Sequence, residues 1–258
     1  MGIVSKRFLE IDIIKGIAVT FMVIFHFFFL SRYMDVYPYI INQGMLYYFA
    51  KIAHYIFIFI VGVNLSIINQ KYIKSKEVRK VKQFKRGIFL LGGGMIISVL
   101  SYIAFGDLYV KFGILHFLGV SIIISQFIID SNILVGTIGI SVILLYFLLQ
   151  SFPNNFFNTC WKFPMLCFIS GIKNIKYSSL DHFSIIPYFS LICLGILLGD
   201  SIYSKGIKRK DKLVDEVIDK IDKNILVKTI ATLGKYSLQI YFIHILIIYF
   251  ILFVYKKY

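Results

Sequence analysis

The residues with the widest choice of chemistry in this sequence are its histidines, because an imidazole exchanges protons near neutral pH. The chain has five, which are His26, His54, His116, His182 and His244. His26 lies in the segment 13–30, which is otherwise apolar around it, so no sequence neighbour satisfies the ring. An ionisable side chain that persists in hydrocarbon is a functional candidate by default. If segment 13–30 spans a membrane, His26 is therefore the first candidate for a catalytic residue.

A carboxylate near His26 would raise the basicity of the imidazole and fix its tautomer, as general-base catalysis requires. Asp12 lies fourteen positions earlier, which is about 21 Å along a helix, at the opposite end of the segment. Asp181 is the better candidate, because it precedes His182 in a loop that turns into an apolar segment at Pro187. We expect Asp181 to orient His26. The alternative is that Asp181 is a solvated loop charge or a cap on the helix predicted at 183–202.

The elements that must position these side chains follow from composition. Of 258 residues, 59% are hydrophobic and 16% are charged. The apolar runs have about 17–20 residues, the length of helix that crosses about 30 Å of hydrocarbon. The sequence therefore predicts an all-α polytopic membrane protein, with residues 1–258 forming a single integral membrane domain.

Seven transmembrane helices are expected, near residues 13–30, 53–68, 87–105, 112–129, 133–149, 183–202 and 233–255. The apolar segment 160–172 is short for a span and is typical of a re-entrant or interfacial segment. Residues 214–225 repeat apolar side chains at helical spacing between charged ones, which predicts an amphipathic helix on the cytoplasmic surface.

The basic residues set the orientation. A net charge of +15 would suggest nucleic acid in a soluble protein, but here it lies in loops, where anionic lipids and the positive-inside rule explain it. We therefore expect the lipid bilayer as partner and no nucleic acid. The short basic stretch 71–86 should be cytoplasmic, and so should the N-terminus. Seven spans also place the second basic stretch, 205–228, on that side, whereas eight would place it outside.

In this orientation all five histidines lie in the central or outer half of the membrane, as a polar cavity open to the outer face would need. For each of the others, the alternative is a structural hydrogen bond to a neighbouring helix. The three cysteines form no CxxC pair, so no metal site is expected. The abundance of Ile, Lys and Tyr suggests an AT-rich prokaryotic genome, and hence the cell membrane of a prokaryote.

Several segments together resemble a known family. The stretch Glu10–His26 resembles the "(L/V)D-x-x-R-G-x-A" opening of the transmembrane acyltransferase superfamily. Further segments resemble the catalytic domain of heparan-α-glucosaminide N-acetyltransferase and its prokaryotic relatives, in the family's order and over nearly the whole chain. They are Ile58–Gly62, Lys85–Gly87, Phe112–Val120, Asp181–Phe189 with Leu194–Gly195, and Leu233–His244.

The resemblance implies acyl transfer at a membrane, from cytosolic acetyl-CoA or another acyl-CoA to a hydroxyl or amine of a sugar or glycolipid-like acceptor on the outer side. The superfamily's catalytic histidine maps onto His26. The arginine of the opening motif is Lys15 here, which keeps the charge but loses a bidentate grip on phosphate. The loop 31–48 has no histidine, whereas the animal enzyme has one after its first helix that is held to be catalytic.

These residues suggest a division of roles. Lys15, Lys85 and Arg86 would hold the phosphates of acyl-CoA, with a positive-inside anchor as the alternative. His26 would remove the acceptor's proton. A hydrogen-bond donor to the tetrahedral oxyanion would come from one of three side chains: His116, His182 or Tyr188.

Three questions stay open at this point. Direct transfer and a covalent acyl-histidine intermediate both fit the residues. The alternative function is a small-molecule transporter or a non-catalytic membrane scaffold, although a transporter would be expected to show repeated halves, which this sequence lacks. A homo-oligomer is also compatible with the sequence.

Overall fold

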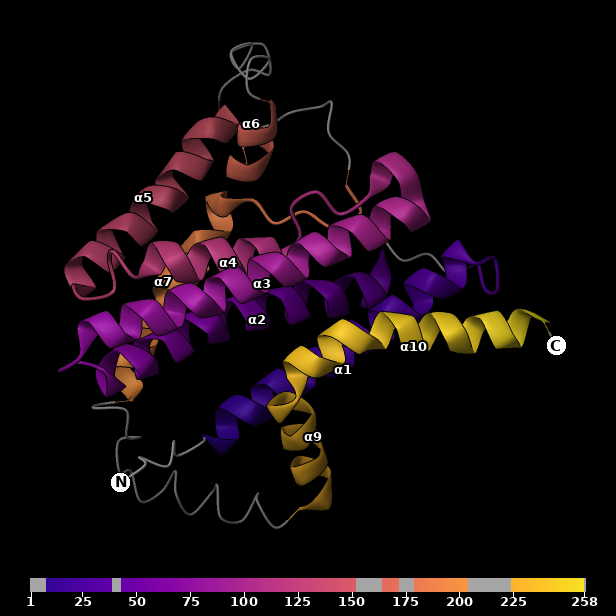
Figure 1. Ribbon diagram of the computed structural model, residues 1–258, viewed down its shortest axis with the longest axis horizontal. Helices are drawn as coiled ribbons and strands as arrows, with labels where there is room; N and C mark the ends of the chain where they lie inside the picture. The colour runs from indigo at the N-terminus through magenta and orange to yellow at the C-terminus, as the bar shows by residue number, and fades with distance from the viewer. Residues whose placement is uncertain (1–7, 39–42, 152–163, 172–178, 204–223, 258) are drawn as a thin grey trace. The chain divides into compact units, whose positions relative to one another are not determined.

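The computed structural model describes residues 8–38, 43–151, 164–171, 179–203 and 224–257 (Figure 1). These residues are helical apart from loops and one isolated bridge between Phe112 and His182. Six helices are long and apolar enough to cross a membrane. They are α1 (Leu9–Tyr33), α2 (Gly44–Lys71), α3 (Lys76–Phe105), α5 (Asn132–Ser151), α7 (Ile185–Ile202) and α10 (Ser237–Lys257). The shorter elements are η1 (Gly106–Leu108), α4 (Ile114–Ser125), α6 (Pro164–Ser170) and α9 (Ile225–Lys235).

The all-helical membrane class is thus confirmed, with two differences in the spans. The fourth predicted span, 112–129, contains only the 12-residue helix α4. The backbone before it is extended, because the N–H of Phe183 donates to the carbonyl of Phe112 at 3.0 Å, and the chain turns again after Ser125. The last predicted span, 233–255, is divided at Tyr236 between α9 and α10.

Two other predicted segments lie wholly or partly outside the described residues. The predicted amphipathic helix at 214–225 lies almost entirely outside the described residues. Helix α9 begins only at Ile225, the last residue of that predicted helix. Of the segment 160–172, the structure describes residues 164–171, which contain the seven-residue helix α6. The re-entrant character of this segment stays a prediction.

The chain divides into two compact units. The first unit comprises residues 1–60 and 209–258, and in it α1 packs against both α9 and α10. Glycines allow the closest approach. A Cβ at Gly16 would overlap the carbonyl oxygen of Ile230, and one at Gly234 would overlap that of Asp12. Gly16 belongs to the opening motif and Gly234 to the last motif, so these two motifs build one helix–helix contact.

The second unit comprises residues 61–208, in which α3 packs against α4 and α5 against α7. Helices α3 and α4 run in opposite directions. A Cβ at Gly87 would lie 2.9 Å from the carbonyl oxygen of Gly119, so small residues bring the two backbones together, as is common between membrane helices. Ser98 Oγ donates to the carbonyl of Val110 at 2.6 Å, which joins the end of α3 to the loop before α4.

Side-chain amides tie several helix ends together at one end of the second unit. Asn69 Nδ2 donates to the carbonyl of Ile129 at 3.0 Å. Gln70 Nε2 and Asn132 Nδ2 donate to the two carboxylate oxygens of Asp200 at 2.8 and 2.7 Å. The ends of α2 and α7 therefore meet the start of α5, and the basic stretch 71–86 leaves from this end. The described chain also leaves α7 here, at Tyr203. The second basic stretch, 205–228, lies almost entirely outside the described residues, so its side of the membrane stays a prediction.

Candidate active site

In the first unit, His26 of α1 lies beside His244 of α10. His244 Nε2 is 3.3 Å from His26 Nδ1, and the ring centroids are 4.9 Å apart with the rings inclined at 67°. The two residues are 218 positions apart in sequence, and the packing of α1 against α10 brings them together. His244 is buried, with an exposed fraction of 4%, and His26 is partly buried. Both ionisable rings lie within helices that are otherwise strongly apolar.

The remaining neighbours of this imidazole pair are backbone carbonyls and aromatic rings. His26 Nδ1 lies 2.9 Å from the carbonyl oxygen of Met22, and the ring of Phe25 stands edge-on to His26 at 5.5 Å. His54 lies on α2, which packs against α1 where Ala53 and Met22 share one buried cluster. The first unit thus gathers three of the five histidines.

Sequence reasoning selected His26 but did not select His244 as a site residue. One signal could have found it, since His244 closes the last motif of the resemblance, Leu233–His244, inside an apolar run like that around His26. What no sequence pattern shows is that the two rings touch.

His116, on α4 in the second unit, has a different environment. Its exposed fraction is 5%, and within the described part of the chain neither ring nitrogen has a hydrogen-bond partner. Gly94 makes room for the ring, because a Cβ there would lie 2.9 Å from His116 Nδ1. A buried polar group without a partner is costly. His116 can therefore offer a hydrogen bond to a water molecule or a substrate.

Asp181 and His182 lie in the loop before α7. Asp181 Oδ2 accepts the N–H of Ile114, the first residue of α4, at 3.2 Å, where a helix N-terminus favours a carboxylate. Burial raises the pKa of Asp181 to about 6. Asp181 therefore accepts a hydrogen bond at the start of α4, and not at the start of α7, the helix that it was expected to cap. Because Asp181 and His26 belong to different units, their predicted pairing stays a prediction.

His182 is held by the helix α6. Its Nε2 lies 2.7 Å from the carbonyl oxygen of Phe168, and the two rings stack with their centroids 3.8 Å apart. Burial lowers the pKa of His182. Tyr188, the third predicted oxyanion donor, packs in an aromatic cluster, with its ring centroid 5.2 Å from that of Phe183.

The predicted phosphate-binding cations are divided between the units. Lys15 lies on α1 in the first unit, one position before Gly16. Lys85 and Arg86 are exposed on α3 in the second unit. Among the residues that the structure describes, no group of three or more His, Cys, Asp or Glu side chains could hold a metal ion.

Comparison with known proteins adds one decisive observation. The family model described as heparan-alpha-glucosaminide N-acetyltransferase, catalytic, matches residues 7–246. The chain belongs to this family. No curated protein and no solved structure shows a significant match to it.

The match indicates the class of reaction to which the family belongs. The heparan-α-glucosaminide N-acetyltransferase family is one of membrane acetyltransferases that use acetyl-CoA, and the apolar helices of this member agree with a membrane location. The matched stretch contains both His26 and His244. It also contains every segment on which the resemblance rested.

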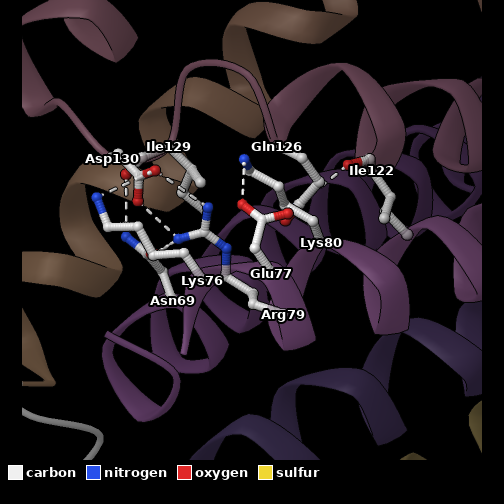
Figure 2. A network of polar contacts seen from close by, with 9 residues as sticks. All are labelled: Asn69, Lys76, Glu77, Arg79, Lys80, Ile122, Gln126, Ile129 and Asp130. Atoms are coloured by element: carbon white, nitrogen blue, oxygen red, sulfur yellow. Dashed lines mark hydrogen bonds and ion pairs between the residues drawn. The ribbon is translucent and has the colours of Figure 1, made fainter. Parts of the chain in front are cut away.

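The second unit also contains a charged cluster that sequence reasoning missed (Figure 2). Arg79 is completely buried, and its Nη1 and Nη2 donate to the two carboxylate oxygens of Asp130 at 2.7 and 3.2 Å. Asn69 Oδ1 accepts from Arg79 Nη1, and Lys76 Nζ lies 3.4 Å from Asp130. The guanidinium of Arg79 lowers the pKa of Asp130. In this member of the acetyltransferase family the cluster joins the ends of α2, α3 and α4.

Proposed function

We propose that the protein is an acyl-CoA-dependent membrane acyltransferase. It moves an acyl group, in the first place acetyl, from cytosolic acyl-CoA to a hydroxyl or amine of a sugar or glycolipid-like acceptor at the outer side of a prokaryotic cell membrane. The observation that carries the proposal is the imidazole pair His26–His244 inside two apolar helices of a chain in this family. Ionisable groups at such positions are retained for function.

In the proposed reaction His26 acts as the general base. It takes the proton of the acceptor hydroxyl or amine as the oxygen or nitrogen attacks the thioester carbonyl. A tetrahedral oxyanion forms and then collapses with cleavage of the carbon–sulfur bond. The CoA thiolate leaves and takes the proton from His26, which restores the neutral imidazole. The products are an ester or amide and free CoA.

Three side chains of the second unit are candidates for stabilising the oxyanion, namely His116, His182 and Tyr188. His116 is favoured among them, because its ring nitrogens have no partner within the described part of the chain and a donor aimed at a developing charge needs to be free to bind it. Asp181 remains the candidate for orienting an imidazole.

The donor would bind at the cytoplasmic side through Lys15, Lys85 and Arg86, since cationic side chains suit CoA phosphates. The exposure of Lys85 and Arg86 supports this assignment. It implies the predicted topology, with a cytoplasmic N-terminus and seven crossings, of which α4 is the fourth. The placement of Asp130, just after α4, beside Arg79 at the start of α3 supports counting α4 as a crossing.

The test is acetyl-CoA binding and CoA release by the full chain in nanodiscs, with and without glucosamine and other amino and hydroxy sugars. We expect His26→Ala to keep acetyl-CoA binding and to lower the rate of CoA release by about 10²- to 10⁴-fold, the usual contribution of a general base. A slow acyl transfer to His26 itself would appear as a burst of one CoA per protein.

The matched control is Thr20→Ala on the same helix, which removes a methyl group and a hydroxyl that donates to the carbonyl of Gly16 at 2.9 Å. Its rate should equal that of the wild type. If the wild-type protein binds no acyl-CoA, the proposal is wrong, and a transporter or scaffold becomes the better interpretation.

A further inference from the structure

The hydrogen bonds of His244 define where this imidazole carries its hydrogen. His244 Nδ1 lies 2.9 Å from the carbonyl oxygen of Ile240 and 2.8 Å from that of Tyr241. A carbonyl oxygen only accepts hydrogen bonds, so Nδ1 must carry the hydrogen and donate it. A neutral imidazole has one N–H. The Nε2 of His244 therefore holds a lone pair.

That lone pair faces His26. His244 Nε2 is 3.3 Å from His26 Nδ1, and two lone pairs facing each other at this distance would repel. His26 Nδ1 must therefore carry a hydrogen. The carbonyl oxygen of Met22, 2.9 Å from the same nitrogen, is a second acceptor for it, and one N–H can be shared between two acceptors.

The opposite assignment conflicts with Met22. If His244 donated from Nε2, His26 Nδ1 would hold a lone pair that pointed at a carbonyl oxygen 2.9 Å away, and His244 would have to be a cation among apolar helices. The neutral assignment satisfies every contact. It leaves the Nε2 of His26 with a lone pair and, within the described part of the chain, without a hydrogen-bond partner.

We infer that His244 is a positioning residue, whose Nε2 holds His26 in the tautomer that leaves the His26 Nε2 free to accept a proton. The inference rests on the proposed function of His26. When His26 takes the proton, its Nδ1–H becomes a cationic donor, and the hydrogen bond to His244 strengthens. In serine hydrolases a carboxylate orients the basic histidine. A neutral imidazole does the same here without placing an anion in hydrocarbon.

The kinetic test compares two variants of His244. His244→Phe keeps a ring and removes Nε2, whereas His244→Gln offers an amide oxygen at about the same reach. We expect the Phe variant to lower kcat for transfer from acetyl-CoA by about 10- to 100-fold, the size of effect known for losing the hydrogen-bond partner of a metal-bound histidine, with KM unchanged. The Gln variant should recover most of the loss. Ile247→Phe, at a position of α10 that is 52% exposed, adds the same ring away from the pair and should leave kcat unchanged.

The spectroscopic test does not depend on turnover. The full chain in nanodiscs is labelled with ¹⁵N-histidine, and the His26 signals are assigned by their loss in His26→Ala. We expect a protonated Nδ1 and an unprotonated Nε2 in the wild type, and a rise in the other tautomer in His244→Phe. The thermal midpoint of each variant shows whether it is folded.

The outcomes separate the inference from the proposed function. A wild-type His26 that carries its hydrogen on Nε2 would overturn the inference, and so would a His244→Phe variant with full kcat and unchanged nitrogen shifts. If no form of the protein transfers an acyl group, the proposed function fails, and the nitrogen shifts alone decide whether His244 sets the tautomer.

Discussion

The first unit places two neutral imidazoles side by side, whereas the second unit buries a guanidinium against a carboxylate. In the second unit both terminal nitrogens of Arg79 and both carboxylate oxygens of Asp130 are used by the protein itself. In the described part of the first unit, every nitrogen of the imidazole pair has a partner except the Nε2 of His26. The same chain thus fixes helix ends with an ion pair whose facing atoms are all engaged, although Arg79 Nε has no partner among the described residues. In the imidazole pair it leaves one ring nitrogen open, where a proton can move. Variants that leave Arg79 unpaired should therefore lower stability, whereas variants of the imidazole pair should lower the rate of acyl transfer. The reverse result would contradict the comparison.

The largest effect on stability is expected for Asp130→Ala. It leaves the buried Arg79 without its anion, and an uncompensated buried charge costs about 3 kcal/mol or more. Asp130 itself is 36% exposed, so solvent screening places the loss at the lower end of this range. The acyl-transfer rate of the folded fraction should not change. Thermal unfolding in detergent, measured beside the transfer rate, checks both statements.

Two controls sharpen this prediction. The double variant Arg79→Met with Asp130→Leu should lose less stability than Asp130→Ala, because no buried charge is left unpaired. Glu77→Gln breaks the neighbouring pair with Lys80, whose side chains are 82% and 46% exposed, and should change stability by less than about 0.5 kcal/mol. A double variant as unstable as Asp130→Ala would contradict the assigned role of the ion pair.

A smaller effect is expected for Gly234→Ala, which tests the packing that supports the imidazole pair. The new Cβ would overlap the backbone carbonyl of Asp12, so α9 must shift away from α1, at a cost of about 1–3 kcal/mol. Gly92→Ala is the matched control, because a Cβ at Gly92 meets nothing within 4 Å. It should be neutral or stabilising by up to about 1 kcal/mol. Equal midpoints for the two variants would show that α1 and α9 do not pack so closely.

The fold was largely predictable because hydrocarbon thickness sets helix length, which apolar runs reveal directly. The shortening of α4 was not predictable, since it depends on pairing between Phe112 and Phe183, far apart in sequence. The break at Tyr236 was also missed, because no glycine or proline stands at that position. Local signals predict where helices exist, and long-range contacts decide where they end.

The site was predictable only in part, for a related reason. His26 could be selected because an imidazole in an apolar run is conspicuous. His244 could not be assigned as its partner, because the contact joins helices at opposite ends of the chain. Arg79 looked like any other residue of the basic stretch 71–86. Its spacing with Gln83 indicates a shared helix face, but only packing against α4 shows that this face is buried.

The smallest effect is expected for Asp181→Asn, and it depends on pH. Burial raises the pKa of Asp181 from 3.8 to about 6, so the folded protein holds this proton more tightly than the unfolded chain. The wild type therefore loses stability as the pH rises from about 4 to about 6. The amide that replaces the carboxyl group in this variant does not titrate and can still accept the N–H of Ile114. The stability of the variant relative to wild type should therefore rise with pH across this window and stay level above it.

Asp130→Asn should show the opposite slope, because Arg79 lowers the pKa of Asp130. The stability that this carboxylate contributes is present above its unfolded pKa and is lost as the pH falls through its folded pKa. Relative to wild type, Asp130→Asn should therefore lose stability as the pH rises. Unfolding midpoints of both variants between about pH 2.5 and 7.5 test the contrast, because the Asp130 carboxylate titrates below about pH 4 and that of Asp181 between about pH 4 and 6. Parallel slopes would mean that Asp181 is ionised in the folded protein, and would make it the stronger candidate for pairing with an imidazole.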